Sequence, residues 1–174
     1  LVNGRIDTGS LRFEVEYHDI EELNRGAGLG RADISKISCA VLPAIAEHYV
    51  LLDSGAALGR GNGPLLVRRA GDTRPIRRVP GLHTTANVLM GKLFPEIEER
   101  TPLLFSRIAA AVERGDFDAG VLIHEGRFVY RERELELVAD LGQLWEQRTA
   151  LPLPLGGIAA RRSLPDEVRH EAER

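Results

Sequence analysis

A histidine follows a short apolar run: residues 121–123 are all branched aliphatics, and His124 comes directly after them. Such a run is typical of a strand buried on both faces of a sheet. Open α/β sheets bind ligands at the carboxyl ends of their strands, so His124 stands where it could meet a ligand. Its pKa can be moved across neutrality, which suits a general base. From this segment alone, a histidine that only hydrogen-bonds backbone at a strand end stays the alternative.

A second group of candidate ligand-binding residues precedes an expected helix at residues 86–94. Residues 80–85 combine a glycine, a histidine and two threonines after an expected strand. Free amides and the positive dipole end of a helix bind anions, so Thr84 and Thr85 mark a candidate anion site. Either threonine could equally be an ordinary N-cap. The glycine-rich residues 54–64 lack the Gly-Lys-Ser/Thr ending of a phosphate-binding loop, which favours a tight loop between strands.

The composition limits the classes of protein and partner that these residues can serve. The 174 residues are 43% hydrophobic and 28% charged, with a formal net charge of -3, which is ordinary for a globular protein. No basic tract suggests a nucleic-acid partner, and no apolar run has the length of a membrane span. The single cysteine, Cys39, excludes an intramolecular disulfide and a cysteine-built zinc site.

Strands and helices are expected to alternate along the chain. Asp19 is a good N-cap for a helix that starts after it, and Gly115 is expected to end another helix. The order of the elements indicates an α/β fold with mainly parallel sheets. Strands are expected at residues 11–17, 33–38, 49–52, 65–68, 76–79, 103–105, 121–123, 135–138 and 158–160, and helices at 20–27, 40–47, 86–94, 107–114, 140–149 and 164–174.

Four segments occur along the chain in a recognisable order and spacing. They are Leu-Gly-Arg-Gly-Asn-Gly-Pro at 58–64, Pro-Gly-Leu-His-Thr-Thr at 80–85, Ile-His-Glu-Gly-Arg-Phe at 123–128 and Leu-Pro-Leu-Pro-Leu-Gly at 151–156. Together they resemble the 1,4-dihydroxy-6-naphthoate synthases of the futalosine route to menaquinone, and Asp140-Leu141-Gly142 and Trp145-Glu146 fit the same family. Each segment is weak alone, but four in register are specific. The resemblance covers essentially the whole chain.

This resemblance implies an α/β fold like the type II periplasmic binding proteins, with two lobes and a cleft between them. The lobes are expected at residues 1–79 and 80–154, with residues 155–174 returning towards the first lobe. Members of the family begin with a further strand and a Pro-Asn-Asp-Thr-type loop, and they continue for several helices beyond the position of Arg174. The first lobe is therefore expected to be incomplete, without its first strand and closing helices.

The resemblance also implies a lyase reaction that converts cyclic dehypoxanthine futalosine to 1,4-dihydroxy-6-naphthoate in the bacterial cytoplasm, without a metal or organic cofactor. His124 matches the family's catalytic base. The positions that match substrate-contacting residues are Asn24, Lys36, Ile37, Ser38, Thr85 and Ala86. The implied partner is a small-molecule carboxylate substrate, with no nucleic acid and no membrane, and a homodimer is left open.

Three other functions remain open. A solute-binding protein of the same fold would carry no chemistry, since fold does not imply function. Chorismate dehydratase is a related enzyme of the same pathway, but the histidine segment and the Leu-Gly-Arg-Gly loop favour the synthase. An effector-sensing domain of a transcription regulator is the third alternative, although no segment of this chain looks like a DNA-reading helix.

Overall fold

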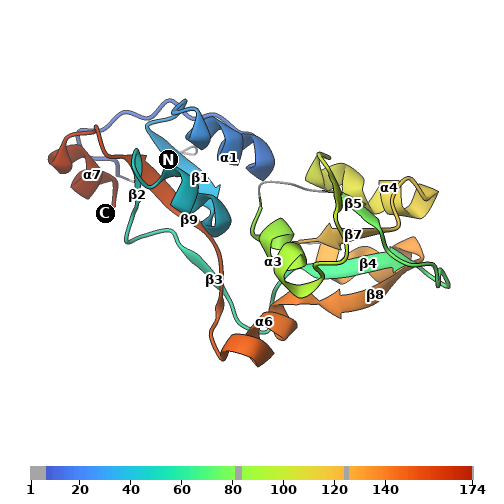
Figure 1. Cartoon of the computed structure of the whole chain (residues 1–174). Helices are drawn as coiled ribbons and strands as arrows, with labels where there is room; N and C mark the ends of the chain where they lie inside the picture. The colour runs from blue at the N-terminus through green and yellow to red at the C-terminus, as the bar shows by residue number, and fades with distance from the viewer. Residues whose placement is uncertain (1–6, 81–83, 124–125, 174) are drawn as a thin grey trace.

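Two lobes, each built on its own β-sheet, make up the computed structural model, which describes residues 7–80, 84–123 and 126–173. Figure 1 shows that two extended segments, β3 (Ala57–Gly59) and the start of β9 (Leu153–Arg161), run between the lobes. These two segments pair antiparallel, with Gly59 opposite Leu153. The chain therefore leaves the first lobe and returns to it along one double-stranded connection.

The first lobe is organised around the long strand β9. Strands β1 (Ile34–Ser38) and β2 (Tyr49–Leu51) flank it, and both run antiparallel to it. Its core includes Ile37 and Tyr49, which are fully buried. The helical elements of this lobe are α1 (Ile20–Gly28), η1 (Cys39–Val41), α2 (Leu42–Ile45) and α7 (Asp166–Ala172).

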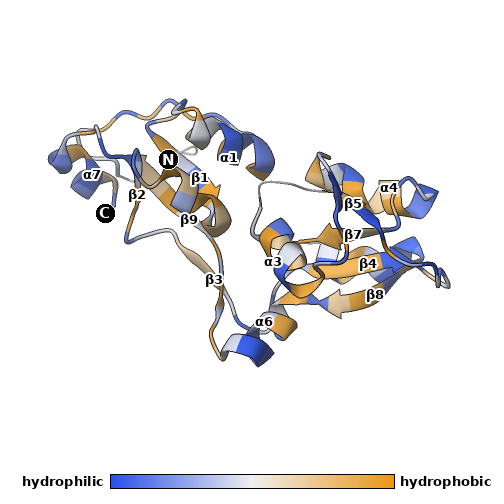
Figure 2. Cartoon of the chain, viewed as in Figure 1, coloured by the Kyte–Doolittle hydropathy of each residue, from blue (hydrophilic) through white to orange (hydrophobic). Residues whose placement is uncertain are grey.

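The second lobe is built on the sheet β7-β4-β8, with a small parallel pair, β5 and β6, beside it. Its strands are β4 (Leu65–Arg69), β5 (Arg78–Pro80), β6 (Glu99–Thr101), β7 (Ala119–Leu122) and β8 (Leu135–Asp140). Its helical elements are α3 (Thr85–Leu93), η2 (Phe105–Arg107), α4 (Ile108–Arg114), α5 (Gly126–Val129), η3 (Tyr130–Arg133) and α6 (Leu141–Thr149). Figure 2, coloured by residue hydropathy, shows mostly apolar residues along β4 and β7 and hydrophilic residues in part of α6.

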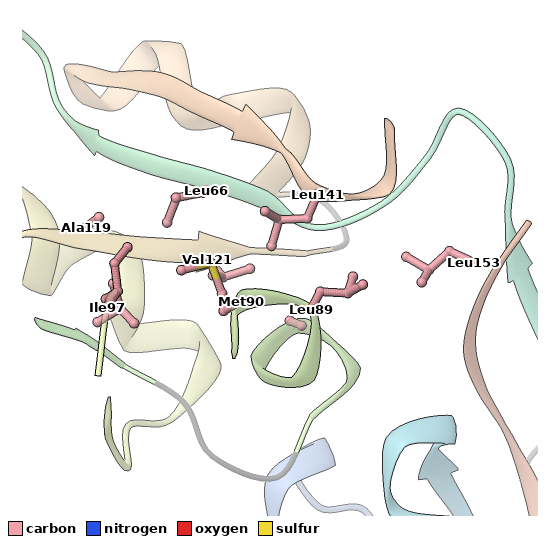
Figure 3. Packing of buried hydrophobic residues seen from close by; sticks show 10 residues of the cluster. Leu66, Leu89, Met90, Ile97, Ala119, Val121, Leu141 and Leu153 are labelled. Carbon is pink, nitrogen blue, oxygen red and sulfur yellow. The ribbon is translucent and has the colours of Figure 1, made fainter. Parts of the chain in front are cut away.

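β7 is buried on both faces, as the apolar run at residues 121–123 predicted, and residues 65–67 of the neighbouring β4 are buried as well. Successive side chains of a strand point to opposite faces, so Leu66 packs with Met90 of α3 on one side, in the cluster drawn in Figure 3. Its neighbour Leu65 packs with Ile108 and Val112 of α4 on the other side. Val121 and Leu122 of β7 belong to the same two clusters, so the strand that ends before His124 is also held between α3 and α4.

Local signals placed several helix ends correctly. Asp19 caps α1 by accepting a hydrogen bond from the Glu21 amide at 2.9 Å, and Gly115 ends α4 in the left-handed conformation with φ 82°. Thr84 is the N-cap of α3 and accepts from the Asn87 amide at 3.2 Å. These features depend on a few neighbouring residues, which is why the sequence suffices to predict them.

Two strand predictions were wrong, and so was the expected strand direction. Residues 11–17 form no strand, and Val15 and Tyr17 are 44% and 74% exposed, because no described strand pairs with this alternating segment. Residues 103–105 lead into η2 instead of forming a strand. Among the strand pairs that the structure describes, only β5–β6 is parallel, because β9 runs antiparallel to its neighbours in the first lobe and β4 runs antiparallel to β7 and β8 in the second.

The pairing of β4 also corrects the expected first lobe of residues 1–79. β4 lies between β7 and β8, with Leu66 opposite Val121 and Ala139, so it belongs to the second sheet. β5 pairs with β6 in the same lobe. The boundary differs because the chain leaves the first lobe along β3, which ends at Gly59, before β4 begins. Strand grouping along the sequence does not reveal such a crossing.

Candidate active site

A cavity of about 190 Å³ opens between the lobes. The first lobe contributes residues from the start of α1 together with Lys36 of β1, and the second lobe contributes Phe105 and Ile123. A narrower pocket of about 30 Å³ adjoins it, since both are lined by Asp19, Ile20, Phe105 and Ile123. The cleft therefore lies at the carboxyl end of β7, where an α/β protein binds its ligands.

The helices α1 and α3 both begin at this cleft, but their electrostatic character differs. At α1, Asp19 caps the helix and Glu21 and Glu22 occupy the first turn, so negative charge already lies near the positive end of the dipole. The first turn of α3 holds no acidic residue, and Thr84 and Ala86 from its start line the narrow pocket. An anionic ligand is therefore better placed at α3 than at α1.

Asn24 and Ser38 are joined by two hydrogen bonds. The Asn24 side-chain amide donates to Ser38 Oγ at 3.0 Å, and the Ser38 backbone amide donates to Asn24 Oδ1 at 2.8 Å. Their exposed fractions are only 2% and 5%. The pair therefore ties α1 to the end of β1.

Thr85 and Ser38 come from different lobes but meet neighbouring residues of β9. The Thr85 hydroxyl donates to the Leu155 carbonyl at 3.0 Å, and Ser38 pairs with Gly156. Gly156 must lack a side chain, because an added Cβ would lie 2.7 Å from the Ile37 carbonyl oxygen. The connection between the lobes thus brings these expected site residues close to each other.

The structure separates the expected site residues into two groups. Lys36 and Ala86 line the two adjoining pockets. Asn24, Ile37, Ser38 and Thr85 do not line them and instead hold the elements behind the cleft in place. His124 and His83 lie outside the described residues. Ile123, directly before His124, lines both pockets.

Several residues that line the pockets were not expected from the sequence, among them His18 and Phe105. His18 lines the larger cavity, and its ring nitrogens lie 3.0 Å from a Glu16 oxygen and 3.2 Å from a Glu22 oxygen. Hydrogen bonds to Glu16 and then Glu22 raise the pKa of His18 above its ordinary value. The position of Glu22 four residues after His18 could have predicted this contact from the sequence. Phe105 also lines both pockets. It was not predicted as a pocket residue because residues 103–105 were expected to form a strand.

Two searches of the described residues gave no sites of other kinds. Within residues 7–80, 84–123 and 126–173, no group of three or more histidine, cysteine or acidic side chains is arranged to hold a metal ion. Across the same residues, no helix combines the length and apolar character needed to cross a membrane.

Known proteins resemble this chain in sequence and in structure. A family model described as menaquinone biosynthesis matches residues 4–174. The 1,4-dihydroxy-6-naphtoate synthase of Thermus thermophilus is 44% identical over 168 residues, which are 94% of this chain and 61% of that protein. The 1,4-dihydroxy-6-naphtoate synthase of Streptomyces coelicolor is 40% identical over 172 residues, again 94% and 61%. The chain thus spans about 61% of the length of these relatives.

Solved structures support the same fold. A crystal structure of a protein from Archaeoglobus fulgidus matches with a TM-score of 0.91 at 36% identity, over 98% of this chain and 65% of that one. The ligand-binding component of an ABC-type import system from Staphylococcus aureus, solved with zinc bound, matches with a TM-score of 0.66 at 10% identity, over 91% of this chain and 58% of that one. This second likeness shows the α/β fold of solute-binding proteins that the resemblance implied. With its family model matched over residues 4–174, the chain belongs to the menaquinone biosynthesis family.

Proposed function

We propose that the protein is a 1,4-dihydroxy-6-naphthoate synthase, a lyase that converts cyclic dehypoxanthine futalosine to 1,4-dihydroxy-6-naphthoate in the cytoplasm. The observation that carries this proposal is the cleft at the end of β7, where Ile123 lines both pockets and the next residue in the chain is His124. The 44% identity to the Thermus thermophilus synthase supports the same reaction. We assign His124 as the general base.

The start of α3 and Lys36 are the proposed anchors for the carboxylate of the substrate. The α3 terminus carries no acidic residue in its first turn, and Lys36 supplies a positive charge on the opposite side of the cleft. Ser38 and Thr85 support this site from behind, through Asn24 and the Leu155 carbonyl. Free helix amides and a lysine are a suitable pair for an anion.

The carbon skeleton of the substrate is proposed to occupy the cavity of about 190 Å³ and to extend along the adjoining narrow pocket. The wall of the narrow pocket includes the apolar side chains of Met90, Leu103, Phe105 and Val121. Such a wall excludes water and favours a flat hydrocarbon ring, while a few polar groups at one end set its orientation. This division matches a substrate with a ring system and a carboxylate.

The base step requires a neutral imidazole. His124 takes a proton from the carbon skeleton, and the electron pair of the broken C–H bond then starts ring opening of the substrate. General-base assistance of this kind is worth on the order of a hundredfold to ten-thousandfold in rate. The rate is therefore expected to rise with pH through the titration of His124 and then to level off.

The decisive experiment uses the protein expressed from its complete reading frame. Incubation with cyclic dehypoxanthine futalosine, followed by chromatography, is expected to yield 1,4-dihydroxy-6-naphthoate. His124→Asn should bind the substrate but lose most of kcat, because asparagine cannot accept a proton at neutral pH. Glu125→Gln is the matched variant and should keep most activity; loss in Glu125→Gln with a normal His124→Asn would transfer the base role to Glu125.

The same assay separates the rival functions. Tight binding of the substrate without turnover would favour a solute-binding protein, and conversion of chorismate in a parallel incubation would favour chorismate dehydratase. Sedimentation of the same sample tests the homodimer, and fractionation of the source cells tests the cytoplasmic location. The synthase proposal requires that 1,4-dihydroxy-6-naphthoate forms from cyclic dehypoxanthine futalosine and that chorismate is not converted.

A further inference from the structure

Arg127 lies close behind His124 in the chain and makes a network of hydrogen bonds that the proposed chemistry does not use. Its Nη1 donates to the Gly63 carbonyl at 2.7 Å, and its Nη2 donates to Asp140 Oδ2 at 2.6 Å and to the Gly61 carbonyl at 3.4 Å. The arginine side chain is 19% exposed and that of Asp140 13%. A mostly buried guanidinium with fixed acceptors is a rigid anchor.

The acceptors of Arg127 are themselves held firmly. Gly63 lies backbone against backbone with Gly142, since a Cβ built on Gly63 would be 2.4 Å from the Gly142 Cα atom. Asp140 ends β8 and caps α6 by accepting from the Gln143 amide at 3.0 Å. Gly61 and Gly63 belong to the segment that enters the second lobe after β3. Arg127 therefore bonds to the place where the interlobe connection meets the second sheet.

The segment that carries Arg127 has little else to hold it. Its helix α5 has four residues and no buried side chain, and Phe128 is 77% exposed. On its N-terminal side, the Gly126 amide donates to the Ile123 carbonyl at 3.1 Å. Ile123 in the cleft wall and Arg127 in the anchor therefore lie on either side of residues 124–125 along the chain.

We propose that Arg127 is a positioning residue for His124: it secures the segment after the base to the interlobe connection through Gly63 and Asp140. This inference rests on the proposed base role of His124. Arg127 does not line either pocket and acts through the backbone it holds. Correct placement of a reacting group matters strongly, since a misplacement of about 1 Å can cost on the order of a hundredfold in rate.

Arg127→Lys provides the main test, measured in the protein from its complete reading frame. Lysine keeps the charge but lacks the planar fork that serves three acceptors together. We expect kcat to fall at least about tenfold while KM changes less than about threefold, the pattern of an interaction that matters in the transition state. The pH at which kcat levels off should stay in place, because the base is unchanged and only its position is disturbed.

Two further variants keep the test decisive. Arg131→Lys is the matched control, since Arg131 lies four residues further on and bonds the neighbouring Tyr130 hydroxyl at 3.1 Å; it should retain normal kcat. Asp140→Asn keeps an N-cap for α6 but removes the charge that pairs with Arg127, and should lower kcat in the same direction by a smaller factor. It replaces Arg127→Lys if that variant does not fold.

The outcomes distinguish this inference from the proposed function. Normal kcat in both Arg127→Lys and Asp140→Asn, with His124→Asn inactive, overturns the positioning role alone. A loss in Arg127→Lys that appears wholly as a raised KM also overturns it, because the residue would then serve binding. Normal turnover in His124→Asn overturns the base and the inference together.

Discussion

The side chain of Asn24 bonds both the hydroxyl and the backbone amide of Ser38, and these two bonds tie the helix α1 to the last residue of β1. Asn24 supplies both a donor and an acceptor, and both residues are almost fully buried. This pair explains how two residues from separate segments can form one support for the cleft.

Asn24→Ala should destabilise the protein more than Ser38→Ala. The first change leaves the buried Ser38 amide without its acceptor, which costs about 1–3 kcal/mol, whereas the second keeps that amide bond and removes only the hydroxyl. Urea unfolding followed by circular dichroism measures the difference in free energy of unfolding. Equal values for the two variants would contradict the importance of the amide bond.

Thr85→Val should weaken substrate binding, because the start of α3 loses its bond to β9, and should cost about 1 kcal/mol of stability. The Thr85 hydroxyl bonds the Leu155 carbonyl and ties the start of α3 to β9. Thr84→Ala is the comparison, because Thr84 is the N-cap and its loss should cost about 1 kcal/mol of stability. Calorimetric titration gives the affinity and thermal melting gives the stability; unchanged affinity in Thr85→Val would remove Thr85 from the site.

Gly63→Ala and Gly142→Ala should both destabilise the protein strongly, by more than about 1 kcal/mol, because a Cβ at either position meets backbone of the other glycine. Gly91→Ala is the control within α3. Its new Cβ would meet nothing within 4 Å, and a glycine inside a helix costs about 0.5–1 kcal/mol relative to alanine. The control should therefore raise the melting temperature. Similar shifts in all three variants would refute the close backbone contact.

His18→Gln should lower stability below about pH 6.5 and make little difference well above it. Hydrogen bonds to Glu16 and then Glu22 raise the folded-state pKa of His18 above its ordinary value of about 6.5. A raised pKa means that the stabilisation is fully present below the unfolded-state pKa and is lost as pH rises through the folded-state pKa.

Melting temperatures of both proteins across pH 5.5 to about 9 would measure this effect, which should be small because His18 is exposed. Replacing Glu16 and Glu22 together by glutamine should abolish the pH dependence of the difference. If the difference in melting temperature between His18→Gln and the unmodified protein grew as pH rose, it would contradict this explanation.

Features set by neighbouring residues could be predicted from the sequence. The Asp19 cap, the Gly115 helix end and the buried strand before His124 depend on a few adjacent side chains and their period. The segments that resemble the synthases also led to the fold and to Lys36 and Ala86, which line the cleft. Local conformational preference and apolar spacing depend on residues that are close in the sequence. These features can therefore be predicted without knowing which distant segments they contact.

Features that depend on a distant partner were decided only by the tertiary structure. The alternating residues 11–17 fit the strand pattern, but no described strand pairs with them. β4 belongs to the second sheet because it forms backbone hydrogen bonds with β7 and β8. The bonds from Arg127 to Gly63 and Asp140 join residues that are 64 and 13 positions away. Strand pairing and buried ion pairs depend on which segments come into contact in the folded protein. The spacing of residues along the chain does not predict those contacts.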